Sequence, residues 1–146
     1  MRIFTALLAT VLLLASSQAY SRNDKLMISI QDAFETMDYK NKLDPDIKFY
    51  FGDQKHAKVS KSYGVYSTSK KTNSFNKSDE EACRWAMLSA LITMQKRAIN
   101  EGGNAVINIV SYYDRHVVSS ETEFECHAGT FMTGVAIQGK AAKLAK

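Results

Sequence analysis

Four ionisable side chains alternate with other residues along one short segment of the chain: Glu121, Glu123, Glu125 and His127. Carboxylates and imidazole bind divalent metal ions, and residues at i and i+2 of a strand point to the same side. The same alternation is typical of a solvent-facing strand that pairs with Lys or Arg on a neighbouring strand. We favour the solvent-facing strand, expect no cofactor, and keep metal binding by these four residues as the alternative.

A second segment, from Gly134 to Ala141, nearly matches the phosphate-binding loop G-x-x-x-x-G-K-[ST]. Ala141 stands where that loop needs a hydroxyl for Mg²⁺. The residues between Gly134 and Gly139 are an alternating apolar run, which is typical of a strand and not of a loop that wraps around phosphates. We therefore expect no nucleotide-binding site here.

Catalytic patterns are otherwise lacking. The chain has three histidines, His56, His116 and His127, and neither G-x-S-x-G nor H-E-x-x-H occurs. We expect no catalytic residues and no enzymatic activity. An enzyme whose Ser, His and Asp are dispersed along the sequence is a further alternative.

Positive charge is concentrated between Lys40 and Lys77, where nine Lys accompany three Asp. A basic stretch can bind phosphate, an acidic glycan or an anionic lipid, and basic residues interleaved with Tyr and Phe also occur in single-strand nucleic-acid binders. Lys residues equally protect exposed strand edges from pairing with other chains. We favour this edge role, expect no nucleic-acid partner, and keep anion binding as an alternative.

The first 19 residues have the pattern of a secretory signal peptide. Arg2 gives a basic start, residues 3–15 are almost wholly apolar, and residues 17–19 place small side chains at a cleavage site. The apolar run is shorter than the roughly 20 residues that span a bilayer. We predict cleavage after Ala19, a periplasmic or secreted location, and no stable membrane anchor. Loss of Arg2 lowers the net charge from +4 to +3.

The remaining chain, residues 20–146, has two cysteines, Cys83 and Cys126. In an exported protein they predict one disulfide. Cys83 lies on the core-facing stripe of a predicted helix, and Cys126 alternates with Phe124 toward the core, so the bond would join the helix to the sheet. Closing a loop of about 44 residues contributes roughly 4 kcal/mol. The alternative is a free, acidified thiol at Cys83 near the helix N-terminus.

The clearest element is a helix over residues 79–101. Ser78 and Glu81 form a capping box, acidic residues occupy its first turn, and Gly102-Gly103 ends it. Its apolar arc is wide, with a core-facing stripe and a second stripe made of Trp85, Leu88, Ile92 and Ile99. We expect the N-terminal segment to cover the second stripe, a subunit interface being the alternative.

The other predicted elements are a short helix over 30–39, strands over 47–51, 59–67, 105–113, 122–127 and 130–140, a loop over 68–77 and a turn over 114–116. In the second strand, Val59, Tyr63 and Val65 are expected on one face. This order predicts a single α+β domain over residues 20–146. Its small antiparallel or mixed sheet has about five strands, with the long helix packed on one face and a short N-terminal helix beside it.

Several motifs resemble a family of small exported bacterial proteins to which the name "excinuclease ATPase subunit" is often given. They are Lys42-Leu43-Asp44-Pro45, Phe49-Tyr50-Phe51-Gly52, Lys70-Lys71-Thr72-Asn73, Asn76 to Cys83, and Glu101 to Val106. The name implies ATP hydrolysis. Because the phosphate loop is not intact and no second ATPase motif occurs, we expect neither ATPase nor excinuclease activity.

The C-terminal part is more remotely similar to the Rcs-type envelope-stress lipoprotein sensor and to the YbjQ-like family. The similarity covers the long helix, the Gly-Asn-Ala-Val that follows it, and the last strands through Phe131 to Ile137. The sensor also has a disulfide between helix and sheet. The present chain lacks a lipid-attachment cysteine, so membrane anchoring and sensing are not implied.

These patterns lead to one functional hypothesis and two alternatives. The hypothesis is an exported, disulfide-stapled, non-enzymatic protein that contacts an envelope protein or another envelope component. The first alternative is a metal- or anion-binding module that uses the acidic strand or the Lys-rich segment, and the second is an enzyme with a dispersed site. The sequence leaves the oligomeric state open.

Overall fold

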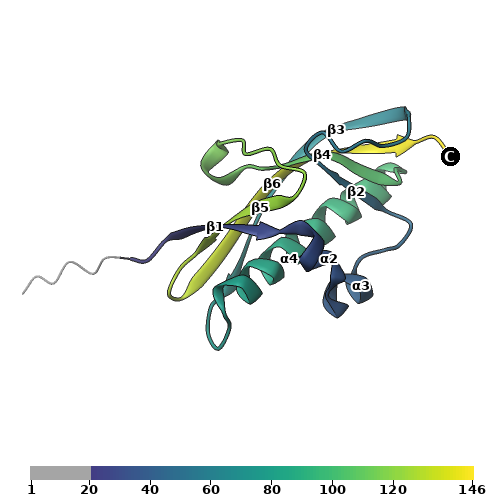
Figure 1. Cartoon of the computed structure of the whole chain (residues 1–146). Coiled ribbons are helices and arrows are strands. Elements are labelled where there is room, and N and C mark those ends of the chain that lie inside the picture. Colours follow the sequence, from purple (N-terminus) through teal and green to yellow (C-terminus); the bar gives the residue numbers. More distant parts are fainter. Residues whose placement is uncertain (1–20) are drawn as a thin grey trace, which may run out of the picture.

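A computed structural model describes residues 21–146, and the signal peptide predicted over residues 1–19 lies outside the described residues. The elements follow in the order β1 (Asp24–Ser29), α2 (Ile30–Glu35), α3 (Met37–Lys42), β2 (Lys48–Phe51), β3 (Val59–Asn73), α4 (Asp79–Glu101), β4 (Ala105–Ser111), a 3₁₀ helix (Tyr113–Arg115), β5 (Glu123–Ala128) and β6 (Met132–Leu144). Figure 1 shows the long helix α4 lying along a twisted sheet. The predicted α+β class is confirmed.

The described strands form one mixed sheet of six strands rather than about five. β6 is its central strand. β3 runs antiparallel along one edge of β6, while β4 and β5 pair antiparallel with successive parts of the other edge. β1 extends the sheet antiparallel to β5, and β2 extends it parallel to β4. β1 was not predicted as a strand; the other strands were found with shifted ends.

The helix α4 has the predicted bounds and the predicted glycine end, and of the predicted capping box it has the bond made by the Ser78 side chain. Ser78 Oγ accepts a hydrogen bond from the Glu81 N–H at 3.1 Å, which pairs one of the free donors of the first turn. At the other end Gly102 has φ 86°, the left-handed conformation that glycine adopts without steric cost. The core-facing stripe of α4 is buried and packs against β3, β4, β5 and β6.

The N-terminal segment covers part of the second stripe of α4, as expected. Tyr39 is 2 % exposed, and its hydroxyl donates to the Arg84 carbonyl of α4 at 2.8 Å. Burial raises the pKa of the Tyr39 hydroxyl, so this donor stays protonated. The predicted helix over 30–39 is broken into α2 and α3 at Thr36, which has extended backbone and donates its hydroxyl to the Ala33 carbonyl. Ile99, at the far end of the stripe, remains 46 % exposed.

The predicted loop over 68–77 is wrong for most of its length, because β3 continues to Asn73. Its polar residues are compatible with a strand because β3 is an edge strand with one side in solvent. The predicted grouping of Tyr63 with Val65 is also wrong. Gly64 has φ 107° at a register shift between β3 and β6, and this irregularity leaves Tyr63 packed on the core and Val65 56 % exposed.

The predicted disulfide is confirmed. Cys83, in the first turns of α4, is bonded to Cys126 of β5, with the two Cα atoms 5.8 Å apart. Both residues are 0 % exposed and belong to the main hydrophobic core. The reactive-thiol alternative for Cys83 therefore does not apply to this state of the protein.

We predict that the double substitution Cys83→Ala and Cys126→Ala lowers the free energy of unfolding by about 4 kcal/mol, because the unfolded chain is no longer restricted by the closed loop. Urea denaturation of residues 20–146 measures this change. Ser89→Ala, on the exposed side of α4, is the control and should change stability by less than about 0.5 kcal/mol. A loss below about 1 kcal/mol in the double variant would contradict the prediction.

Candidate functional site: a groove between helix α3 and strand β2

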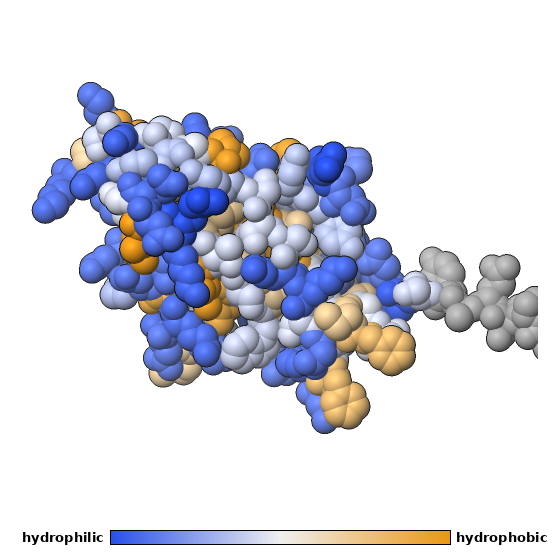
Figure 2. Space-filling model, turned by 180° about the vertical axis from the view of Figure 1, so that it is seen from behind, coloured by the Kyte–Doolittle hydropathy of each residue, from blue (hydrophilic) through white to orange (hydrophobic). Residues whose placement is uncertain are grey.

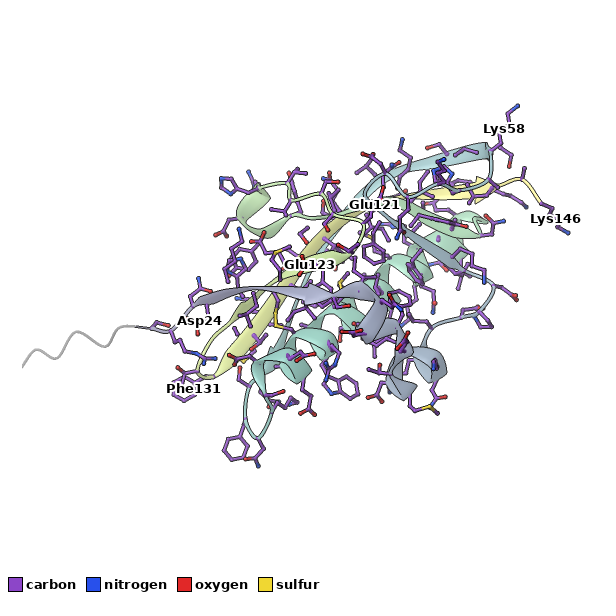
Figure 3. All side chains as sticks on the ribbon, in the orientation of Figure 1. Asp24, Lys58, Glu121, Glu123, Phe131 and Lys146 are labelled. Atoms are coloured by element: carbon purple, nitrogen blue, oxygen red, sulfur yellow. A yellow bond between two sulfur atoms is a disulfide. The ribbon has the colours of Figure 1, made fainter. Side chains whose placement is uncertain are left out.

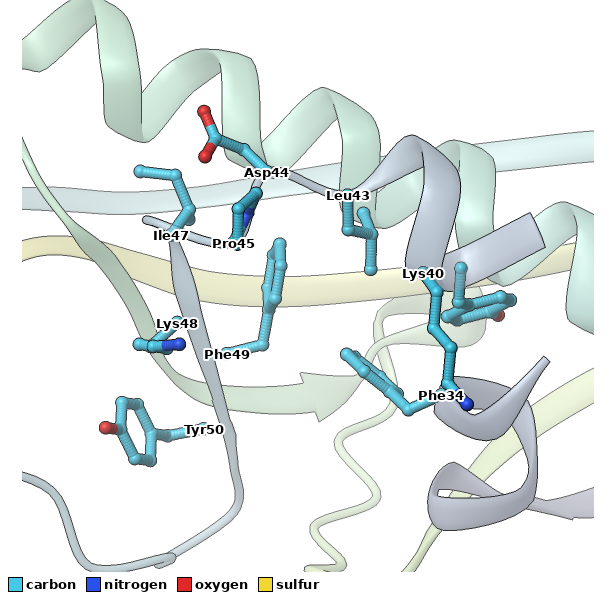
Figure 4. A pocket seen from close by; sticks show the side chains of 10 residues that line it. Phe34, Lys40, Leu43, Asp44, Pro45, Ile47, Lys48, Phe49 and Tyr50 are labelled. Atoms are coloured by element: carbon cyan, nitrogen blue, oxygen red, sulfur yellow. The ribbon is translucent and has the colours of Figure 1, made fainter. Parts of the chain in front are cut away.

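A groove of about 480 Å³ opens where the two short helices meet the edge of the sheet (Figure 4). The residues that line it come from α2, α3, the α3–β2 connection and β2. They are Phe34, Tyr39, Lys40, Leu43, Asp44, Pro45, Ile47, Lys48, Phe49 and Tyr50. In the close-up, the Phe49 ring lies between Pro45 on one side and Leu43 and Phe34 on the other. The site therefore combines an apolar interior with lysines at its edge.

The α3–β2 connection is held in place by hydrogen bonds at its start and by a buried side chain at its end. The Asp44 N–H donates to Gln95 Oε1 of α4 at 2.7 Å, and Asp44 Oδ1 accepts the Asp46 N–H at 2.8 Å in a tight turn. Ile47 is 6 % exposed and anchors the start of β2. These contacts fix one wall of the groove to the long helix, so the groove is part of the folded framework.

An aromatic cluster forms the interior of the groove around Phe34. Its ring centroid lies 5.3 Å from that of Tyr39 and 6.1 Å from those of Phe49 and Phe51, at tilted or edge-on angles that aromatic pairs favour. Tyr39 and Phe51 are buried, whereas Phe34 and Phe49 are half-buried. The cluster is thus continuous with the core on one side and open to solvent on the other.

Charge at the mouth of the groove is mainly positive. Lys40 and Lys48 are exposed on opposite walls, one on α3 and one on β2. The carboxylate of Asp44 is engaged with the backbone of its own turn. The described residues that line the groove include no His, Cys or Ser, and their charged groups are the two lysines and Asp44. The chemistry that this lining offers is burial of an apolar group together with pairing of an anion.

The strand β5 differs in part from our prediction that Glu121, Glu123, Glu125 and His127 lie on a solvent-facing side. Phe124 and Cys126 face the core as expected, and Glu123 is exposed, but Glu125 is 6 % exposed. The reason is that the chain following β4 folds over this side of the sheet. Tyr113 stacks on the His127 ring with centroids 3.5 Å apart and an angle of 9° between the planes. The solvent-facing assignment is therefore wrong for Glu125.

Glu125 and His127 form a pair beneath this cover. His127 Nε2 lies 2.6 Å from Glu125 Oε1, and His127 Nδ1 lies 3.2 Å from Asn23 Oδ1. Lys25 Nζ, on the neighbouring strand β1, lies 3.8 Å from Glu125 Oε2. The expected pairing of this strand face with a Lys is thus present, while both nitrogens of the imidazole are engaged with neighbouring oxygens.

The four residues of the metal-binding alternative are not brought together. Glu121 lies in the bend before β5, and Figure 3 shows it apart from Glu123. Within residues 21–146, no group of three or more His, Cys, Asp or Glu is arranged to hold a metal ion. Only Glu125 and His127 of the four are in contact, and the geometry gives no support to a metal centre on this strand.

The segment that resembles a phosphate loop lies wholly inside β6. Its backbone pairs with β3 on one side and with β4 on the other, so its N–H groups are not available to a phosphate. Packing explains why residue 139 is a glycine, because a Cβ atom at this position would lie only 2.9 Å from Val106 Cγ1.

Residues 21–146 contain no helix whose length and apolar character would suit it to cross a membrane.

Sequence reasoning missed Phe34 and Tyr113 as site residues. Lys48, Phe49 and Tyr50 were noted only as part of a basic and aromatic stretch. The signal that the sequence offered for the groove was a cluster of aromatic residues just after a Pro-containing turn. No pattern near Tyr113 indicated that it would stack on a residue of another strand, because that contact depends on the path of the chain after β4.

We predict that Glu125→Ala lowers the free energy of unfolding by about 2 kcal/mol, because it removes the partner of a half-buried imidazole N–H. Glu123→Ala, two residues earlier on the same strand and exposed, is the matched control and should change stability by less than about 0.5 kcal/mol. Urea denaturation of both variants measures the difference. Equal effects would contradict the structural role assigned to Glu125.

Comparison of the chain with protein-family models, with curated protein sequences and with solved structures gave no significant match.

Proposed function

We propose that this protein is an exported, disulfide-stapled binding protein without enzymatic activity. Its groove binds an apolar segment of an envelope protein partner that carries an acidic group. The observation that carries the proposal is the half-buried aromatic cluster around Phe34 and Phe49, which opens to solvent between Lys40 and Lys48.

Two features support export to an oxidising compartment. The buried bond between Cys83 and Cys126 is of the kind that persists outside the reducing cytosol. The sequence of residues 1–19 has the basic start, apolar run and small-residue site of a secretory leader. Together they favour a periplasmic or secreted protein.

The lining of the groove favours binding over catalysis. Half-buried aromatic rings gain free energy when a ligand removes them from water, by about 25 cal/mol for each Å² of apolar surface. Lysines at the mouth add attraction for an anion and select against cationic ligands. Neither contribution needs a reacting group. The same lining gives no support to ATP hydrolysis, which requires phosphate-binding backbone and a metal.

An extended peptide suits the shape of the groove better than a compact ligand. β2 is the last strand of its branch of the sheet, so among the described residues its outer edge has no paired strand. An added peptide strand can form backbone hydrogen bonds along such an edge, and alternate side chains can enter a neighbouring pocket. Phe49 would then contact the apolar side chains of the peptide, and Lys48 its acidic group.

We predict that Phe49→Ala weakens peptide binding about tenfold, since burial of a Phe side chain contributes about 1.5–3 kcal/mol. The probe is a fluorescein-labelled hexapeptide of alternating valine and phenylalanine that ends in a free carboxylate, followed by fluorescence polarisation. Lys48→Glu should weaken binding about two- to fivefold, because an exposed ion pair contributes at most about 1 kcal/mol. Its affinity should also depend less on salt.

The control for both substitutions is Phe75→Ala. Phe75 is 78 % exposed and lies in the β3–α4 loop, outside the groove, so this variant should bind the peptide like the wild type. Equal affinity in the wild type and in Phe49→Ala would contradict the site. Tight binding of dodecanoate without binding of the peptide would contradict the peptide and favour a lipid ligand.

We also predict that the protein recovered from the periplasm or medium begins at Tyr20 and carries no free thiol. Mass spectrometry after alkylation without reduction measures both properties. An alkyl group on Cys83 or Cys126, or recovery of the full-length chain only from the cytosol, would contradict export.

A further inference from the structure

Two phenylalanines project from neighbouring loops at one end of the molecule. Phe75, in the β3–α4 loop, is 78 % exposed, and Phe131, in the β5–β6 turn, is 82 % exposed. They are the most exposed of the large hydrophobic residues described. Figure 3 shows Phe131 at the end of the β5–β6 hairpin, and Figure 2 shows hydrophobic side chains projecting near the start of the described chain. We call this pair the aromatic tip.

Hydrogen bonds between the two loops hold the aromatic tip together. The Ser74 N–H donates to the Phe131 carbonyl at 2.8 Å, and the Ser74 and Thr133 hydroxyls lie 2.8 Å apart. The β3–β6 ladder continues to the pair Asn73 and Met132 at the base of both loops. The rings therefore leave the domain from a fixed base, although 56 residues separate them in the chain.

The start of the described chain lies at this same end. Arg22 Nη2 is 2.6 Å from Asp79 Oδ1 at the N-terminus of α4 and 3.3 Å from the Gly129 carbonyl of the β5–β6 turn. The described chain therefore begins beside the aromatic tip.

We propose that the aromatic tip docks the exported protein on the surface of a lipid bilayer, with both phenyl rings inserted at the level of the headgroups. Protruding rings on two loops form a convex feature, which a fluid membrane accommodates. A stable protein interface needs a broader surface, of about 800 Å² on each partner. Aromatic side chains inserted from a polar surface bind membranes by the apolar area that they bury.

Basic residues around the aromatic tip add to this attraction. Lys77, in the same loop as Phe75, is held by the neutral side chain of Asn73, and Lys71 lies near the base of the β5–β6 turn. Among the nearby carboxylates, Asp24 and Asp79 share the single charge of Arg22, Glu80 is paired with Arg84, and Glu81 lies in the first turn of α4. The two lysines are positioned to meet lipid phosphates, while the neighbouring carboxylates keep this charge contribution small beside that of the two rings.

The test is flotation of residues 20–146 with vesicles of phosphatidylethanolamine and phosphatidylglycerol. The wild type should float with the vesicles, and Phe75→Ser or Phe131→Ser should each lower the partition coefficient about tenfold, the loss expected for one buried ring. Met37→Ser is the matched control, because Met37 is 67 % exposed but lies on α3, away from the aromatic tip. Thermal melts should be unchanged in all three variants, since these side chains are exposed.

A second measurement locates the inserted group. With brominated lipids, tryptophan fluorescence of Phe131→Trp should be quenched, whereas that of Met37→Trp should not. Equal flotation of the wild type and the double Phe variant, or no flotation at all, would overturn the proposal. A concentration-dependent dimer that the same Phe substitutions abolish would also overturn it, in favour of a second copy of this chain. Because the aromatic tip and the groove share no residues, peptide binding is measured independently of flotation.

Discussion

The buried junction between the first turns of α4 and the middle of β5 is the constraint on which the rest of the structure depends. There the bond between Cys83 and Cys126 joins helix to sheet inside the main core. Once α4 is fixed, its Arg84 carbonyl and its Gln95 side chain hold α3 and the start of the α3–β2 connection. The groove beside β2 is therefore positioned indirectly by the bond that fixes the helix to the sheet.

The two surfaces with unusual chemistry lie on different parts of this framework. The groove combines the half-buried Phe34 and Phe49 with flanking lysines, whereas the aromatic tip has almost fully exposed rings on two loops. A half-buried cluster beside a strand edge that pairs with no other strand of residues 21–146 suits a peptide, and protruding rings suit a fluid surface. A protein docked on a membrane through the aromatic tip would present its groove to partners near that membrane.

The pair of Glu125 and His127 shows how a covering segment changes the meaning of a sequence pattern. Strict alternation along β5 placed Phe124 and Cys126 in the core, and this was correct. It also implied that the opposite side of the strand was solvated, which holds for Glu123 but not for Glu125. Tyr113 covers the His127 ring, and the covered carboxylate of Glu125 keeps His127 as a hydrogen-bond partner, with Lys25 3.8 Å away.

Local patterns were reliable where local physics decides the structure. The bounds of α4 followed from its cap residues and from Gly102, because capping satisfies backbone groups within one turn. The disulfide followed from the presence of two cysteines, each on a core-facing position. The end of β3 was missed, because a polar edge strand and a polar loop have the same composition, and only pairing with β6 separates them.

The sequence by itself therefore determined the class of fold, the long helix and its caps, and the covalent link between helix and sheet. Only the tertiary structure decided that Phe34 meets Phe49 beside the outer edge of β2, that Glu125 is covered, and that the loop of Phe75 is hydrogen-bonded to that of Phe131. The physical reason is distance along the chain. Helix caps and strand alternation act within a few residues, whereas these contacts join segments that only the pairing of strands and the packing of α4 bring together.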